Sequence, residues 1–302
     1  MRAVVIDWPG GPESLRVAVV PVPSPGAGEV RVRVAAAAVN PVDVMTRSGV
    51  FHRVGWIRRR TVGLGWDVAG VVDEVGPGVG DMTPGTLVAG LRDALDAPLG
   101  TYADYVILPA DAVAPVPDGI DPVAASTMPL NALTADQALD LVDPSRGDSL
   151  LVTGAAGGVG GYVVPLALER GWRVTALARE RDREWLLALG ASRVVHHLDG
   201  EKHQYDAAID AADLVAPTMA AVRDGGDFVG VQPAFVPAAE RGVRVQAVAV
   251  RRDAARLGKL LALAVEGHLP LRVAGTLPLA QAAEAHRRLE AGGSRGRWVL
   301  VP

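Results

Sequence analysis

The stretch SLLVTGAAGGVGGYVVPLAL, residues 149–168, contains no charged side chain. A helix of this length could cross a lipid bilayer. Five of its residues are glycines that lie within eight positions: Gly154, Gly157, Gly158, Gly160 and Gly161. The stretch also combines two patterns, since residues 149–153 form a short apolar run typical of a buried strand, whereas 159–170 has a helical pattern that ends before Gly171. We therefore interpret it as a strand, a glycine turn and a helix, although Pro165 lies inside that helix.

A strand, a glycine turn and a helix together form the phosphate-binding unit of dinucleotide folds. Small residues let the backbone approach a pyrophosphate, and the helix N-terminus supplies N–H donors. The glycine fingerprint G-x-G-x-x-G is present here with Ala155 in place of the first glycine, followed by Gly157 and Gly160. By itself this match would also suit a glycine-rich corner that binds nothing.

The residues that follow favour nucleotide binding. Apolar runs that predict five more strands follow the motif, with helices mostly between them: 171–179, 193–197, 205–212, 225–232 and 243–250. This alternation predicts an α/β domain with a doubly wound parallel sheet. The candidate cofactor-binding residues in its turns are Ala155, Gly157, Gly158, Val159, Gly160, Gly230 and Gln232. Only residues 198–204 join the third and fourth strands, so the usual crossover helix is expected to be missing or reduced to a turn.

The composition excludes several kinds of protein. The 302 residues are 49% hydrophobic and 21% charged, with a net charge of -4 and no cysteine. Disulfides, thiolate metal sites and a cysteine nucleophile are therefore excluded. No basic segment suggests nucleic acid or an anionic membrane as a partner. Because the first residues become polar too early for a signal peptide, we expect a cytoplasmic protein.

The region before residue 115 has a different pattern, with short strands separated by proline and glycine turns. Val30, Val32 and Val34 alternate with arginines, which predicts a sheet with one buried face and one solvated face. We expect a closed or partly closed β-barrel. A proline-rich segment over 111–122 marks the boundary, and the helix and strand predicted in 277–302 could rejoin this first domain.

Together with these patterns, several longer motifs make the sequence resemble the zinc-independent quinone oxidoreductase branch of the medium-chain dehydrogenase/reductase superfamily. The resemblance is carried by AAVNPVDVMTRSG (37–49), GLGWDVAGVVDEVGPGV (63–79), GTYADYVILP (100–109), PLNALTADQAL (129–139), TGAAGGVG (153–160) and AAEAHRRLEAGGSRGRWVLV (282–301). It implies a GroES-like catalytic domain over 1–118, rejoined by 268–302, and an inserted Rossmann domain over 119–267. It also implies hydride transfer from a nicotinamide cofactor to a quinone or an enone.

The resemblance further implies that the protein needs no metal. Zinc-dependent relatives have a cysteine ligand where Asn40 stands and a histidine ligand where Trp66 stands, and neither replacement is a useful zinc ligand. The histidines at 196, 197 and 203 cluster in the sequence, but they lack the spacing of a zinc motif.

The type of cofactor is predicted from the end of the second Rossmann strand. An acidic residue there would bind the ribose 2′-hydroxyl of NAD, but Arg179 occupies the position and Arg181 follows. A guanidinium can bind a 2′-phosphate, so we expect NADP(H). His197 follows the third strand, where relatives often have a tyrosine near the adenosine.

The resemblance also suggests the catalytic residues. Asn40 is the candidate donor to the substrate oxygen, and Thr134 matches a threonine beside the nicotinamide. Asp43 and Arg47 are expected to pair with each other or with the backbone. Some relatives have a tyrosine at the position of Met45, and its absence suggests that water supplies the final proton.

The substrate is left open between a quinone or enone and an α,β-unsaturated acyl thioester. In residues 51–63 the aromatic residues Phe51 and Trp56 could stack on a flat ring, as could Trp66, whereas the arginines at 58–60 could bind a phosphate. A non-catalytic NADPH-binding protein is a third possibility. The apolar strand over 243–250 could form a sheet edge through which two chains pair, so we expect a homodimer.

Overall fold

The computed structural model describes residues 1–146 and 148–302, which form two compact units. Unit 1 comprises Met1–Leu130, Arg251–Gly267 and Leu271–Pro302, and unit 2 comprises Asn131–Val250 and His268–Pro270. These limits differ from the domain boundaries proposed from the sequence. One reason is helix α8 (Ala254–Val265), which packs against strand β8 (Val113–Pro115) and so belongs to unit 1.

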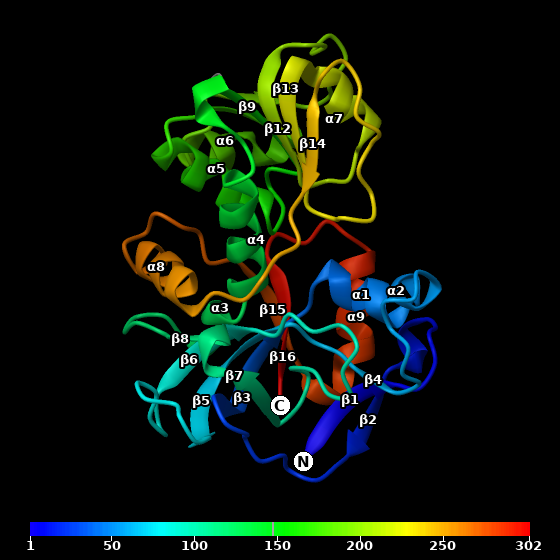
Figure 1. Ribbon diagram of the computed structural model, residues 1–302, viewed down its shortest axis with the longest axis vertical. Helices are drawn as coiled ribbons and strands as arrows, with labels where there is room; N and C mark the ends of the chain where they lie inside the picture. The colour runs from blue at the N-terminus through cyan, green and yellow to red at the C-terminus, as the bar shows by residue number, and fades with distance from the viewer. Residues whose placement is uncertain (147) are drawn as a thin grey trace. The chain divides into compact units, whose positions relative to one another are not determined.

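Unit 2 contains a six-stranded sheet in the order β11-β10-β9-β12-β13-β14, in which every neighbouring pair is parallel (Figure 1). Its strands are β9 (Ser149–Thr153), β10 (Arg173–Leu177), β11 (Arg193–Val195), β12 (Tyr205–Asp210), β13 (Val222–Gly230) and β14 (Arg244–Ala247). Its helices are α5 (Gly160–Glu169), α6 (Arg183–Ala188) and α7 (Ala216–Ala221), and most of α4 (Pro129–Leu139) also belongs to it. The chain therefore starts at the centre of the sheet and winds outward in both directions, which confirms the predicted Rossmann topology.

The opening stretch of the sequence forms strand β9 and helix α5. Leu150, Leu151 and Val152 are completely buried in the middle of the sheet. Helix α5 has ten residues, includes Pro165 and packs against β9 and β10. No helix in the described part of the chain is long and apolar enough to span a membrane. The stretch is thus apolar because its residues are buried in the sheet and in the helix that covers it.

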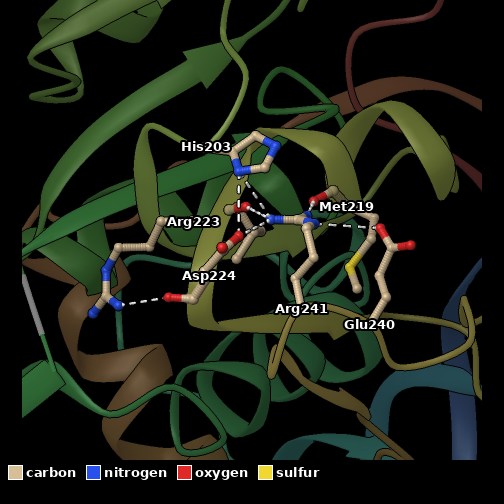
Figure 2. Close-up of polar contacts among 7 residues, drawn as sticks. His203, Met219, Arg223, Asp224, Glu240 and Arg241 are labelled. Atoms are coloured by element: carbon tan, nitrogen blue, oxygen red, sulfur yellow. Dashed lines mark hydrogen bonds and ion pairs between the residues drawn. The ribbon is translucent and has the colours of Figure 1, made fainter.

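Two crossovers of this sheet contain no helix. Residues 196–204 connect β11 to β12 through turns, as the short connection predicts, and residues 231–243 connect β13 to β14. The second connection is fastened by Arg241 (Figure 2). Its guanidinium donates to the carbonyl oxygens of Val222 (2.8 Å) and Met219 (2.7 Å) and to the Asp224 carboxylate (2.9 Å).

Unit 1 is built on two sheets. A small sheet has the order β2-β1-β4, and a larger one has the order β15-β16-β3-β5-β6-β8, with β7 also paired to β3. The strands are β1 (Arg2–Ile6), β2 (Arg16–Val19), β3 (Glu29–Ala38), β4 (Val62–Gly63), β5 (Asp67–Val75), β6 (Leu87–Leu91), β7 (Tyr105–Pro109), β15 (Val273–Pro278) and β16 (Arg297–Val301). The remaining α-helices are α1 (Pro41–Arg47), α2 (Val50–Arg53), α3 (Pro122–Ala125) and α9 (Ala282–Glu290). The 3-10 segments of the chain are Pro12–Ser14, Ala110–Ala112, Pro144–Arg146, Glu180–Asp182 and Leu279–Gln281.

The pairing in the larger sheet confirms two predictions from the sequence. Val30, Val32 and Val34 on β3 are buried, while the neighbouring Arg33 is exposed. Strand β16 pairs with β3 in antiparallel fashion, with Val299 opposite Ala38. The C-terminal segment therefore does rejoin the first unit and completes its sheet.

Candidate active site

The start of helix α1 positions the first candidate catalytic residues in unit 1. Asn40 precedes the helix in an extended conformation, and Pro41 occupies the first helical position, where its missing N–H costs nothing. The Asp43 carboxylate accepts a hydrogen bond from the Asn40 backbone N–H at 2.9 Å. Asn40 and Asp43 are both completely buried. The helix cap therefore holds these two side chains in fixed positions inside unit 1.

Asp43 binds the backbone, as expected, but it does not pair with Arg47. It accepts hydrogen bonds from the Gly65 N–H at 3.0 Å and the Tyr102 hydroxyl at 2.9 Å. Arg47 instead forms an ion pair with Glu290 on α9 at 2.6 Å. Burial raises the pKa of Asp43 to about 6, although its three donors oppose that shift. Asp43 thus joins α1 to two other segments of unit 1.

Asp67 is the residue of this cluster that sequence reasoning missed. Its carboxylate accepts hydrogen bonds from Asn40 Nδ2 at 2.7 Å and from the Leu130 N–H at 2.6 Å. It is completely buried, and burial raises its pKa to about 7. Its place in GWD, directly after Trp66, was the available signal, because that tripeptide was considered only as a lost metal motif.

This chemistry is a poor match for a zinc ion. The Asn40 amide nitrogen is already hydrogen-bonded to Asp67. In the described residues, no group of three or more His, Cys, Asp or Glu side chains is arranged to hold a metal. Asn40, at one of the relatives' ligand positions, is therefore part of a hydrogen-bonded pair with Asp67 in place of a ligand set.

The glycine turn of unit 2 is as tight as a phosphate-binding loop requires. Gly154 has a φ of +57°, in the left-handed region. A Cβ atom on Gly160 would lie 2.4 Å from the Gly154 carbonyl oxygen, and one on Gly157 would lie 2.9 Å from it. Ala155, at the position of the first fingerprint glycine, is buried and donates its N–H to the Leu177 carbonyl at 3.2 Å. Residues 154–160 therefore form a compact turn directly before the N-terminus of α5.

The predicted cofactor residues lie at one edge of the sheet in unit 2. The glycine turn with Gly158 and Val159 follows β9, Arg179 and Arg181 follow β10, and His197 follows β11. Because the strands are parallel, all these positions are at their carboxyl ends, where α/β folds bind ligands. Arg179 is exposed, as is His197, whose Nδ1 lies 3.9 Å from Asp199. Arg179 and Arg181 therefore supply cations on the side of the sheet beyond β9 toward β11, where they alternate with Glu180 and Asp182.

The opposite side of the same edge carries hydrogen-bond acceptors. Gly230 ends β13, and the amide nitrogen of Gln232 donates to the carboxylate of Asp213, which follows β12. The Gln232 Oε1 atom is buried and has no partner among the described residues. Burial and the neighbouring Asp210 raise the pKa of Asp213 to about 6. Sequence reasoning did not find Asp213, because its pairing with Gln232 depends on the two strands being neighbours.

The backbone beside this acceptor pair is strained. Asp213 and the β-branched Val215 have φ values of +52° and +57°. Such conformations are costly in residues other than glycine, and they tend to occur at functional sites. Asp210 holds them in place by accepting hydrogen bonds from the Val215 N–H at 2.7 Å and the Thr153 hydroxyl at 2.5 Å.

Thr134, the third predicted catalytic residue, lies on α4 within unit 2 and is buried. Asn40 and Asp43 belong to unit 1, so the structure brings together two of the three predicted catalytic residues.

Comparisons with known proteins identify the family. Residues 26–118 match the alcohol dehydrogenase GroES-like domain, and residues 189–300 match the zinc-binding dehydrogenase domain. The chain is 32% identical to the chloroplastic NADPH-dependent alkenal/one oxidoreductase of Arabidopsis thaliana, over 88% of this chain and 70% of that protein. The protein belongs to the medium-chain dehydrogenase/reductase superfamily, in its quinone oxidoreductase-like branch.

Other members of the superfamily extend this result. The chain is 30% identical to a mycocerosic acid synthase-like polyketide synthase of Mycobacterium tuberculosis, over 97% of this chain but only 14% of the synthase. The solved quinone oxidoreductase of Coxiella burnetii is 28% identical and superposes with a TM-score of 0.89, over 100% of this chain and 99% of that one. A mycobacterial structure complexed with NADPH is also 28% identical, with a TM-score of 0.83 over the full length of both chains.

Proposed function

We propose that the protein is an NADPH-dependent oxidoreductase that reduces quinones or α,β-unsaturated carbonyl compounds without a metal. The observation that carries this proposal is the 32% identity, over 88% of the chain, to an NADPH-dependent alkenal/one oxidoreductase. The fold alone would not be enough, because this superfamily fold supports several reactions. The residues of the two units supply the further support.

The cofactor edge of unit 2 fits a dinucleotide in one orientation. The glycine turn after the central strand β9 and the start of α5 suit the pyrophosphate. Arg179 and Arg181 follow β10 on one side, so they suit the 2′-phosphate of the adenosine half, with His197 beyond them. Asp213 and Gln232, which follow β12 and β13 on the other side, would offer acceptors for the ribose hydroxyls of the nicotinamide half. When bound, NADPH supplies the hydride from C4 of its nicotinamide.

Unit 1 supplies the polar groups on the substrate side. Asn40, at one position where zinc-dependent relatives have a ligand, forms a buried hydrogen bond with Asp67, which directly follows the second such position. A carbonyl oxygen gains negative charge as hydride adds to the conjugated carbon, so a fixed donor beside it would accelerate the reaction. Asn40 is the proposed donor, and Asp43 holds the cap that positions it. In unit 2, Thr134 is the residue proposed to lie beside the nicotinamide.

A substrate panel tests this function. The purified protein would be mixed with simple quinones, 2-alkenals and enones, with NADPH and NADH in parallel, and the oxidation of the cofactor would be followed by absorbance. We expect turnover with NADPH, weaker turnover with NADH, and an unchanged rate after treatment with a chelator. A rate that disappears with the chelator and returns only with zinc would contradict the metal-free mechanism.

A second candidate function is the reduction of an α,β-unsaturated acyl thioester. The similarity to a polyketide synthase over 97% of this chain favours it. The arginines expected to bind a phosphate are partly engaged, because Arg59 pairs with Asp96 at 2.9 Å and Arg60 stacks over Trp8. An enoyl thioester in the same panel decides this point, since a preference for it over free enones would support the second candidate. Tight NADPH binding without turnover of any substrate would indicate a non-catalytic protein.

A further inference from the structure

Arg92 stands directly beside the Asn40–Asp67 pair in unit 1. It is the first residue after strand β6, in which Leu91 lies opposite Asp67 of β5. Its backbone N–H donates to the carbonyl oxygen of Trp66 at 2.8 Å. Arg92 is therefore fixed, through its backbone, next to the residues that replace the zinc ligands of relatives.

Arg92 forms no salt bridge with a carboxylate in the described part of the chain, although Asp43 and Asp93 lie close enough for their charges to favour its cationic form. Its Nη1 atom donates to the carbonyl oxygen of Ala94 at 2.7 Å, which engages one of the five N–H donors of the guanidinium. Burial lowers the pKa of Arg92 to about 10, so it is still a cation at neutral pH. A partly buried cation that no carboxylate contacts directly is suited to a further anionic partner.

The neighbouring carboxylates are all engaged elsewhere. Both oxygens of Asp43 accept hydrogen bonds, from Asn40, Gly65 and Tyr102. Asp93 is held by Arg252 at 3.0 Å, and Asp96 is held by Arg59. The remaining donors of Arg92 are thus not engaged by a carboxylate of the described chain.

We propose that Arg92 is a catalytic residue that binds the substrate carbonyl oxygen and stabilises the negative charge that hydride transfer creates there. This inference rests on the proposed reductase function and specifies the substrate as a conjugated carbonyl compound. Hydride adds to the β-carbon, the electron pair of the carbon–carbon double bond shifts toward the carbonyl, and the oxygen becomes an enolate. A proton from water then adds to the α-carbon and restores the carbonyl group. The guanidinium donates hydrogen bonds throughout and keeps all its protons.

In metal-dependent enzymes a zinc ion acts as a Lewis acid that stabilises negative charge on a carbonyl oxygen, and Arg92 would perform the same role here. A planar guanidinium can donate two parallel hydrogen bonds to one oxyanion, whereas an ammonium group is a point charge. Arg92 therefore adds a charged donor beside Asn40, whose amide nitrogen has one of its two N–H groups bonded to Asp67.

The first experiment measures turnover of a neutral enone by Arg92→Met, Arg92→Lys, Arg92→Ala and the control Arg33→Met. Arg33 is an exposed arginine on β3, so its replacement makes the same change in net charge away from the site. We expect Arg92→Met to lower kcat by about 10²–10³-fold, as for removal of an oxyanion donor, with little change in KM. Arg92→Lys should recover part of the rate, and added guanidinium ion should partly rescue Arg92→Ala. An unchanged kcat in Arg92→Met would overturn the proposal.

A second enone that carries a carboxylate tests the alternative role of Arg92 as a carboxylate anchor. If Arg92→Met raises KM only for this anionic substrate and leaves kcat for the neutral enone unchanged, Arg92 binds a preformed anion and the catalytic role is wrong.

The last experiment does not depend on turnover. A nitrophenol, whose phenolate is coloured, would be titrated into the wild type and the variants at a pH near its own pKa. We expect the wild type to bind the phenolate form at least tenfold more tightly than Arg92→Met does, while Arg33→Met matches the wild type. Equal binding by all three proteins, with circular dichroism showing each to be folded, would overturn the proposal. If the wild type reduces no quinone or enone, the proposed function fails, whereas this titration still tests the oxyanion site.

Discussion

The Asp67 carboxyl group has no contact with solvent and accepts hydrogen bonds from two N–H donors. Burial disfavours its charged form and raises its pKa to about 7. An unfolded aspartate has a pKa near ~3.9. Between these values the folded protein binds more protons at this residue than the unfolded chain does. Stability that depends on Asp67 therefore decreases as the pH rises through this window. Asp43, with a pKa of about 6, acts in the same direction.

Replacing Asp67 by asparagine should remove part of this pH dependence. The side chain of Asn40 can turn to present its oxygen to the new amide, so the Asp67→Asn variant is expected to fold. We expect its free energy of unfolding, measured with urea, to fall less between pH 5 and pH 8 than that of the wild type. For one proton the slope approaches about 1.4 kcal/mol per pH unit. Identical pH profiles for the two proteins would mean that Asp67 is ionised across this range.

Arg179 should decide which cofactor the protein prefers. A charge-assisted hydrogen bond contributes ~1.5–3 kcal/mol, which corresponds to roughly ten- to a hundredfold in affinity. We therefore expect Arg179→Ala to weaken NADPH binding by that factor and to leave NADH binding almost unchanged. Arg179→Asp should go further, since a carboxylate repels the 2′-phosphate and can bind a free ribose hydroxyl.

Calorimetric titration of both cofactors checks this prediction. Arg173→Ala is a suitable control, because Arg173 begins β10 and so lies at the opposite end of that strand. Equal losses for NADPH and NADH in Arg179→Ala would indicate a structural role for Arg179.

At the scale of elements, the two crossovers without helices need other means of support. The connection from β13 to β14 obtains it from Arg241, whose guanidinium bridges two backbone carbonyls and a carboxylate (Figure 2). Its Nη1 atom also lies 3.3 Å from His203 Nδ1, in the connection from β11 to β12. One side chain thus joins both irregular connections.

Arg241→Met should destabilise unit 2. Hydrogen bonds to a charged group contribute ~1.5–3 kcal/mol, and we expect a loss within that range in urea unfolding. Arg173→Met is the matched control, because its ion pair with Asp148 is well exposed on both sides and should contribute little. If both variants lose the same stability, the Arg241 network has no special role. Hydrogen exchange should also become faster in β14 of the Arg241 variant.

The elements show which parts of the molecule the sequence can predict. The glycine turn, the six strands and the missing crossover helix follow from short-range patterns, and the structure confirms them. The Asn40–Asp67 bond, the placement of Arg92 beside Trp66 and the Asp213–Gln232 pair depend on which strands are neighbours and in what register. A single sequence does not contain this information in any local pattern, so these groups were missed.

For the whole molecule, the sequence and structure together predict a homodimer. Strand β14 is the last strand of the parallel sheet and pairs only with β13 within the described chain. An open strand edge of this kind readily pairs with another copy. Light scattering at micromolar concentration should therefore give twice the chain mass of 31.3 kDa. The amides of residues 244–247 should exchange slowly, and a monomer mass with rapid exchange there would show that the edge is open in solution.

The pairing of β16 with β3 also determines the order in which the two units can fold during synthesis. β16 (Arg297–Val301) lies between β15 and β3, so the large sheet of unit 1 lacks an inner strand until residues 297–301 have been synthesised. The six strands of unit 2 lie between residues 149 and 247 and are complete much earlier. Since domains fold as units during synthesis, unit 2 is expected to fold while the first 130 residues still wait for their last strand. A chain truncated before residue 297 would therefore keep an intact nucleotide fold, while its unit 1 would have two unprotected strand edges.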